Sequence, residues 1–145
     1  MRKAFVVASG VLLAVFAFQF VFAAVGAFTK PAGGDRSYRL HSITGMAVIP
    51  ILTLLTIVFA ALARAPGKLI GLTALPLGLV VLQALLATLA NGLTDAAGET
   101  TTAGLIVGGL HAANGIIAVH VVVGVMRGAR KLGEPAAEPV LVDQA

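Results

Sequence analysis

The 145-residue sequence has no cysteine and little charge, since only 11% of its residues are charged. Without cysteine, the chain has no disulfides, no thiolate zinc sites and no cysteine-ligated iron–sulfur clusters. Six acidic and ten basic residues cannot cover the surface of a soluble domain of this length, whereas 59% of the residues are hydrophobic. The mean hydropathy of +1.02 likewise shows that the chain is too apolar for a soluble domain. The sequence therefore predicts an integral membrane protein whose main partner is the lipid bilayer.

Four apolar stretches are long enough to cross a bilayer, which takes about 20 residues. They are residues 4–28, 40–63, 69–90 and 102–126. Pro50 and Pro76 lie inside the second and third stretches, where we expect kinks because neighbouring helices can satisfy the freed carbonyl groups. The predicted fold class is all-α: a transmembrane four-helix bundle over residues 1–131, followed by a disordered cytoplasmic tail over residues 132–145.

The lysines and arginines predict the orientation of the chain. Seven of them fall on one side of the predicted membrane and three on the other. The seven are Arg2, Lys3, Arg64, Lys68, Arg127, Arg130 and Lys131. We therefore expect a multi-pass protein of the inner (plasma) membrane with both termini in the cytoplasm. The basic residues mark the ends of apolar runs and form no patch, so no nucleic-acid partner is expected.

The sequence reads as two helical hairpins of similar design. The first hairpin carries Gln19 on its outgoing helix and Leu40-His41-Ser42-Ile43-Thr44-Gly45 on its returning helix. The second carries Gln83 on its outgoing helix and Leu110-His111-Ala112-Ala113-Asn114-Gly115 on its returning helix. The shared pattern is a glutamine followed, one helix later, by Leu-His-x-x-x-Gly. Polar side chains within a membrane are costly, so we expect them to face the bundle interior.

His41 and His111 are the candidate axial ligands of a haem iron, because imidazole binds such iron strongly and bundles hold cofactors between facing helices. Gly108 and Gly115 share a helical face with His111, and Gly45 lies one turn after His41. Such rows of glycine would leave room for a flat macrocycle. The alternative is that small residues only allow close helix packing, and that Gln19 and Gln83 are interhelical hydrogen-bonding residues, which we favour for the glutamines.

Arg36 and Arg39 precede His41 and would either bind haem propionates or anchor the helix at the membrane interface, as would Tyr38. His120 lies nine residues after His111, which turns it to the opposite helical face, away from this site. We expect it to be a buried hydrogen-bonded histidine, or to face lipid or a partner. Asn114, together with His111 and Gln83, could also line a quinone or lipid site.

The Gln19, His41, Gln83 and His111 set resembles an uncharacterised actinobacterial family of small four-span membrane proteins, over about residues 11–130. Paired histidines on the second and fourth helices also look like one half of haem A synthase and, more loosely, like cytochrome b561-type bundles. These resemblances imply axial ligation by His41 and His111. The chain has half the helices of a haem A synthase, however, and too few histidines for the two haems of a b561 protein.

The function expected from the sequence is that of a membrane protein that binds one haem b and serves electron transfer or haem handling. Two alternatives stay open: a non-catalytic accessory subunit of a larger membrane complex, or a quinone- or lipid-binding membrane protein. No nucleotide loop, nucleophile triad or intramembrane carboxylate pair occurs in the sequence, which argues against ATPases, hydrolases and proton-coupled transporters. A larger membrane complex or a redox partner is the protein partner that these functions would require.

Overall fold

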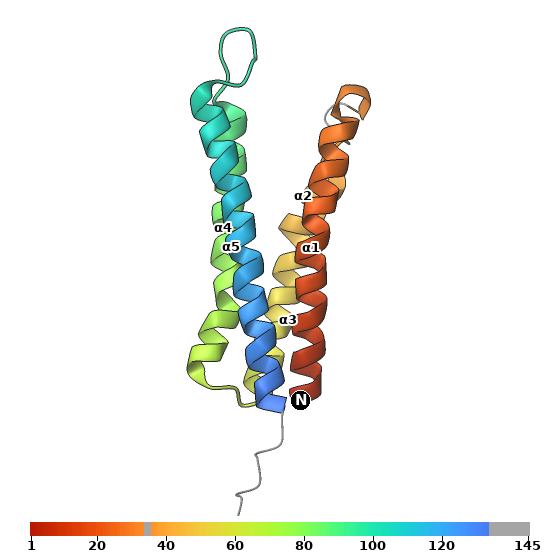
Figure 1. Ribbon diagram of the computed structural model, residues 1–145, viewed down its shortest axis with the longest axis vertical. Helices are drawn as coiled ribbons and strands as arrows, with labels where there is room; N and C mark the ends of the chain where they lie inside the picture. The colour runs from red at the N-terminus through yellow and green to blue at the C-terminus, as the bar shows by residue number, and fades with distance from the viewer. Residues whose placement is uncertain (34–35, 134–145) are drawn as a thin grey trace, which may run out of the picture.

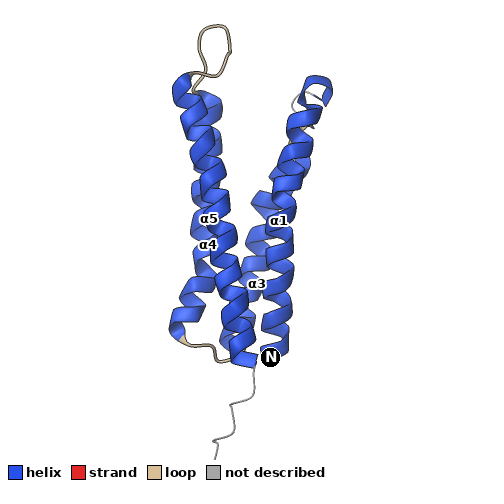
Figure 2. Ribbon diagram, in the orientation of Figure 1, coloured by secondary structure: helices blue, strands red, loops and turns tan. Residues whose placement is uncertain are grey.

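A computed structural model describes residues 1–33 and 36–133 of the chain (Figure 1). Within these residues the fold is all-α, and the only β pairing is an isolated bridge between Thr94 and Thr100 (Figure 2). The helices, in order, are α1 (Arg2–Gly33), α2 (Arg39–Ile43), the π-helix η2 (Thr44–Val48), α3 (Ile49–Leu62), α4 (Gly67–Gly92) and α5 (Thr102–Gly133). Because α2, η2 and α3 follow one another without a break, they form one rod and the molecule is a four-helix bundle.

Four helical segments among the described residues are long and apolar enough to cross a membrane. They are Arg2–Thr29, Arg39–Leu62, Gly67–Gly92 and Thr102–Gly133. These segments confirm the four predicted spans, although the first and last helices are longer than predicted. Helix α5 continues through Gly133, so the expected tail cannot begin at residue 132. The rest of that tail, residues 134–145, lies outside the described residues.

The two prolines inside the spans leave the rods continuous, as expected. Pro76 is buried within α4, which runs on through it to Gly92. Pro50 lies in the first turn of α3, immediately after the π-helix Thr44–Val48. A proline ring clashes with the carbonyl group four residues earlier, and the wider turn of a π-helix moves that group away. The second span thus contains a π-helical turn within one turn of His41.

The packed core occupies one half of the bundle. We call the end where α1 begins and α5 ends the terminal end, and the end that carries residues 93–101 the loop end (Figure 1). One cluster of buried side chains, including Phe5 and Val125, lies at the terminal end, and a second, including Leu12 and Val122, follows it. Beyond these clusters the α1–α2 pair and the α4–α5 pair diverge toward the loop end. The two hairpins are therefore held together mainly by their terminal halves.

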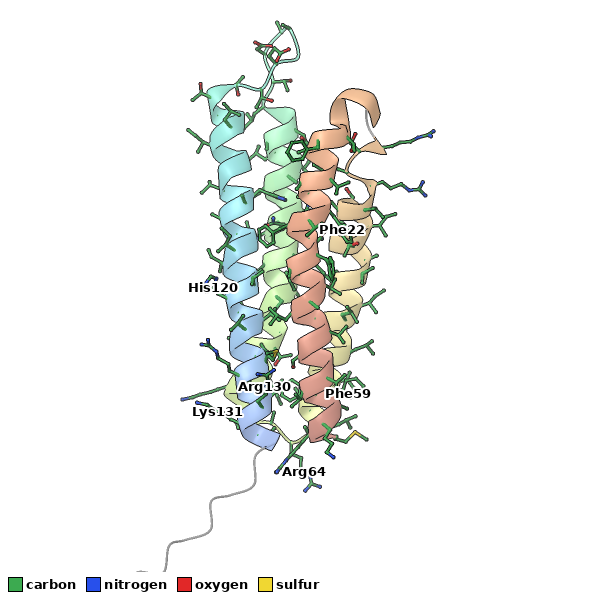
Figure 3. The ribbon with its side chains drawn as sticks, turned by 45° about the vertical axis from the view of Figure 1, so that its right-hand side comes forward. Phe22, Phe59, Arg64, His120, Arg130 and Lys131 are labelled. Atoms are coloured by element: carbon green, nitrogen blue, oxygen red, sulfur yellow. The ribbon has the colours of Figure 1, made fainter. Side chains whose placement is uncertain are left out.

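Most of the described basic side chains lie at the terminal end, while Arg36 and Arg39 lie at the loop end. Figure 3 shows Arg64, Arg130 and Lys131 at the terminal end, whereas the loop end carries the exposed acidic residues Asp95 and Glu99. Large apolar side chains are exposed along the length of the helices, for example Leu54, which is 53% exposed. An apolar outer surface of this kind matches a lipid environment, in which helices need no polar coat.

Candidate functional site

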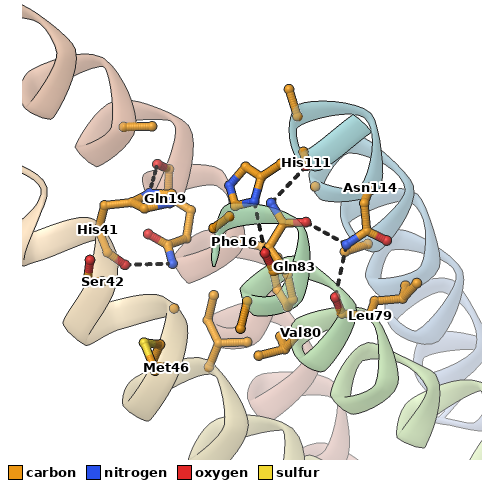
Figure 4. Close-up of a pocket in the computed structure, with 18 of the residues that line it drawn as sticks. Phe16, Gln19, His41, Ser42, Met46, Leu79, Val80, Gln83, His111 and Asn114 are labelled. Carbon is orange, nitrogen blue, oxygen red and sulfur yellow. Dashed lines mark hydrogen bonds between the residues drawn. The ribbon is translucent and has the colours of Figure 1, made fainter. Parts of the chain in front are cut away.

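A pocket of about 300 Å³ lies between the diverging hairpins and is lined by all four membrane helices. It sits near the start of α2 and the end of α4, and therefore toward the loop end. Seven of the ten residues that the sequence proposed for a cofactor site line this pocket: Gln19, His41, Gly45, Gln83, His111, Asn114 and Gly115. Residues that were distant in sequence, on two separate hairpins, thus meet at one place (Figure 4).

Gln19 and His41 form a reciprocal pair of hydrogen bonds between α1 and α2. The side-chain amide of Gln19 donates through Nε2 to the backbone carbonyl of His41 at 3.2 Å. The Nδ1 atom of His41 lies 3.1 Å from the backbone carbonyl oxygen of Gln19. Each residue therefore satisfies a polar group of the other, and the glutamine acts as the interhelical hydrogen-bonding residue that the sequence favoured.

Gln83 and His111 repeat this arrangement between α4 and α5. Gln83 Nε2 donates to the His111 carbonyl at 2.8 Å, and His111 Nδ1 lies 3.0 Å from the Gln83 carbonyl oxygen. Asn114 adds a third partner, because its Nδ2 donates both to the Leu79 carbonyl at 2.9 Å and to Gln83 Oε1 (Figure 4). The repeated sequence pattern thus forms the same pair of glutamine–histidine hydrogen bonds in each hairpin.

These contacts determine the tautomer of both histidines. A carbonyl oxygen only accepts hydrogen bonds, so Nδ1 of each ring must carry the proton, and Nε2 must carry a lone pair. Neither Nε2 atom has a hydrogen bond to another described residue. The two rings project toward each other across the pocket, with centres 6.2 Å apart and planes tilted by 54° (Figure 4). The pocket is therefore lined by two neighbouring imidazoles whose Nδ1 atoms are bound to backbone carbonyls and whose Nε2 atoms carry lone pairs.

The two halves of the site differ in how the glutamine is held. The Oε1 atom of Gln83 accepts a hydrogen bond from Asn114, which is only 5% exposed. The Oε1 atom of Gln19 is buried and has no hydrogen-bond partner in the described part of the chain. Thr44 occupies the position in the first hairpin that Asn114 occupies in the second, and it lies in the π-helix. The first hairpin thus lacks the third residue of the network.

The glycines near the histidines do not all have the role expected of them. A Cβ atom on Gly45 would lie 2.7 Å from Gln19 Nε2, and one on Gly115 would lie 3.5 Å from Gln83 Nε2. Gly45 therefore leaves room for the Gln19 amide, whereas a Cβ on Gly115 would make an ordinary contact with the Gln83 amide; both glycines also line the pocket. Gly108 is not among the pocket residues, and a Cβ there would meet nothing within 4 Å. The row of glycines on α5 is consequently not a continuous wall of the site.

Arg36 and Arg39 are exposed and do not line the pocket. They sit beside it at the loop end, since Arg39 is the first residue of α2. Tyr38 makes an edge-on contact with the His41 ring, with centres 6.4 Å apart. Its ring packs against Gly26, where a Cβ atom would approach to 2.5 Å. His120 lies exposed on the outer face of α5 and bonds only to the Ile116 carbonyl of its own helix (Figure 3).

Sequence reasoning missed the apolar walls of the pocket. Phe16 and Phe20 come from α1, Met46 from the π-helix, and Leu79 and Val80 from α4. An apolar residue in a membrane span carries no signal that separates a pocket wall from a lipid-facing or packed position. Only the polar residues stood out, because their cost in a membrane requires an explanation.

Comparison with known proteins gives one match. A model described as a family of unknown function (DUF6220) matches residues 19–90, which is just under half of the chain. The match includes Gln19, His41 and Gln83 but ends before His111. It agrees with the expected resemblance to an uncharacterised family. No curated protein and no solved structure matches the chain, so the resemblances to haem A synthase and cytochrome b561 receive no support from these comparisons.

Proposed function

We propose that the chain is a b-type haem-binding membrane protein in which His41 and His111 are the two axial ligands. The observation that carries this proposal is the pair of neighbouring imidazoles with free Nε2 atoms. A hydrogen bond from Nδ1 to a carbonyl group is the usual way in which a protein orients a metal-binding histidine and leaves Nε2 for the metal. Gln19 and Gln83 would supply that hydrogen bond through their backbone carbonyls.

The spacing of the rings supports ligation of one shared metal. An imidazole nitrogen binds a metal at about 2.0–2.1 Å, and this nitrogen lies about 1.1 Å from the centre of its ring. Each ring centre is therefore about 3.1–3.2 Å from the metal, and two imidazoles on opposite sides of one metal have centres about 6.2–6.4 Å apart. The observed separation is 6.2 Å. This separation fits one shared metal, and it also falls within the range of about 4.5–7 Å that is usual for packed rings.

A bare metal ion is a poorer occupant than a haem. The described residues contain no group of three or more His, Asp or Glu side chains placed to hold a metal. Two protein ligands are too few for a structural zinc site, which takes four, whereas a porphyrin supplies four nitrogens of its own. Apolar walls such as Phe16 and Ile49 suit the macrocycle.

Space for a macrocycle extends beyond the pocket itself. A neighbouring hollow of about 340 Å³ lies between the second span and α4. It shares the wall residues Met46, Val80, Ala84 and Thr88 with the pocket, so the two hollows are neighbours. The exposed Arg36 and Arg39 at the loop end would be the cationic partners for propionates that leave the membrane core. Two axial imidazoles leave no open coordination position, so the chemistry supplied is one-electron transfer.

A second candidate function rests on the unpartnered Gln19 Oε1 atom. The pocket histidines carry two acceptor atoms, their Nε2 atoms, and Gln19 Oε1 is a buried acceptor in the pocket wall without a donor among the described residues, which is costly. A lipid-soluble ligand with hydroxyl donors, such as a quinol, would satisfy them. The haem proposal is preferred because the ring separation has no role in hydroxyl binding.

The absorption spectrum of the purified protein tests the proposal. After expression with added haem precursor, we expect a Soret band that shifts and sharpens on dithionite reduction, with the low-spin pattern of two imidazole ligands. Replacing either His41 or His111 by alanine should remove the low-spin pattern. A colourless, folded protein would contradict haem binding and favour the quinol candidate, for which co-purified quinone in an organic extract is the measurement.

We also propose that both termini lie in the cytoplasm. The support is the concentration of basic residues at the terminal end, among them Arg64, Arg130 and Lys131. Short loops rich in lysine and arginine are retained on the cytoplasmic side. The haem site would then lie in the outer half of the membrane, where it could exchange electrons with a redox partner at the outer surface.

A further inference from the structure

The two histidines are held to different degrees, although their sequence patterns match. His111 is fixed by Gln83, and Gln83 is fixed in turn by the buried side chain of Asn114. His41 makes its hydrogen bonds with Gln19, whose Oε1 atom has no partner among the described residues, and its ring packs edge-on against Tyr38.

The backbone that carries His41 is also the less firmly packed of the two. The segment from Arg39 to Val48, which comprises α2 and η2, contains no buried residue. Helix α5 around His111 buries Asn114 and Ala118 within the next two turns. A segment with few buried contacts opens at a lower free energy than a packed one. A π-helical turn, which is rare and often found at functional sites, adjoins His41 but has no counterpart beside His111.

From this asymmetry we infer that His41 is the exchangeable ligand, and that its departure opens a binding position for a small neutral diatomic molecule such as carbon monoxide. This inference rests on the proposed haem function. In the exchange, the bond between iron and His41 Nε2 breaks and one bond between ferrous iron and the carbon of carbon monoxide forms. No electron or proton is transferred. His111 stays bound and keeps the haem in the pocket.

The pocket has the polarity for such a ligand. Gly45 lines it on the His41 side and adds no side chain there. The neighbouring walls, including Phe16, Met46 and Ile49, are apolar and offer no hydrogen-bond donor to a charged ligand. A neutral diatomic molecule enters such a site without a desolvation penalty, whereas an anion does not. The site would then sense or transport a gas in addition to passing electrons.

Carbon monoxide binding to the dithionite-reduced, haem-loaded protein tests the inference. We expect the low-spin Soret band to convert to that of a carbon monoxide adduct, at a rate that saturates with ligand concentration because loss of His41 limits it. Gln19→Ala keeps the backbone carbonyl that accepts from His41 Nδ1 but removes the amide that ties α2 to α1. It should therefore raise the saturating rate by about 3–30-fold, which corresponds to the loss of an interhelical hydrogen bond of about 0.6–2 kcal/mol. The matched variant Gln83→Ala should instead lower haem retention.

The single-histidine variants give a second readout that does not depend on kinetics. His41→Ala should keep its haem as a five-coordinate species that binds carbon monoxide at once, whereas His111→Ala should lose most of its haem. If Gln19→Ala does not fold, Gln19→Met, which keeps the side-chain length, replaces it. A haem-loaded protein that forms no adduct, or one in which Gln83→Ala accelerates binding more than Gln19→Ala, overturns the inference. A protein without haem instead overturns the proposed function.

Discussion

Replacing Gly45 by alanine tests whether this glycine exists to make room for a glutamine amide. The new Cβ atom would lie 2.7 Å from Gln19 Nε2, which is closer than a carbon and a nitrogen can approach. The amide at the end of the Gln19 side chain must therefore shift, and we predict that its hydrogen bond to the His41 carbonyl is lost. Interhelical hydrogen bonds in membranes contribute about 0.6–2 kcal/mol.

A helical glycine-to-alanine change also stabilises the folded state, by about 0.8–1.0 kcal/mol. The two effects oppose each other, so Gly45→Ala should change the free energy of unfolding by between about 0.4 kcal/mol of stabilisation and about 1.2 kcal/mol of destabilisation. Gly115→Ala is the matched control, because its Cβ would lie at an ordinary contact distance of 3.5 Å from Gln83 Nε2. Gly108→Ala is a second control with nothing within 4 Å. Both controls should be stabilised.

Reversible unfolding in mixed detergent micelles, followed by circular dichroism, measures these differences. The sharpest form is a double-mutant cycle of Gly45→Ala with Gln19→Ala. Without the glutamine amide, Gly45→Ala should stabilise the protein as the controls do, so the cycle should give a coupling free energy of about 0.6–2 kcal/mol. If Gly45→Ala stabilises the otherwise unaltered protein as much as Gly108→Ala does, with no coupling, the contact has no energetic role and the reasoning fails.

Three further predictions use the same preparations. Asn114→Ala should lower the free energy of unfolding by about 1–3 kcal/mol, because it leaves Gln83 Oε1 without its donor in a buried site; an unchanged unfolding midpoint would contradict this. His120→Ala should change that free energy by less than about 0.5 kcal/mol and leave any haem spectrum intact, because the ring is exposed; a lost spectrum would assign it to the site. A cysteine at Ala97 should react with an impermeant thiol reagent in intact cells, and one at Arg64 should not; the reverse pattern would invert the proposed orientation.

The spans and the meeting of the two hairpins were predictable because each depends on a strong and simple signal. Hydrocarbon requires about 20 apolar residues per helix, and four such runs are visible in the sequence. The repeated glutamine and histidine were visible because polar residues are rare in such runs. Helix ends were less predictable. Helix α5 extends to Gly133, since a helix that leaves the membrane keeps its own backbone hydrogen bonds and needs no apolar residues to continue.

The role of the glycines could not be predicted, because absence of a side chain does not say what fills the space. The row of Gly108, His111 and Gly115 suggested one wall for a macrocycle. In the structure Gly115 lies next to the Gln83 amide, and Gly108 does not line the pocket. Likewise, the reciprocal hydrogen bonds between Gln19 and His41 depend on the offset between two helices, and that offset is not encoded in either segment alone.

The contacts also change how the packing and ligand interpretations relate to each other. From the sequence alone, the two interpretations were alternatives: either the glutamines join helices through hydrogen bonds, or the histidines bind a metal. In the structure a single residue pair does both: the Gln19 amide joins α1 to α2, while the Gln19 carbonyl fixes the proton of His41 on Nδ1. Stability measurements alone therefore cannot separate the two interpretations, because both predict a loss when the pair is broken. Only a measurement that reports on the two Nε2 atoms can do so, since packing makes no use of them and iron ligation requires both.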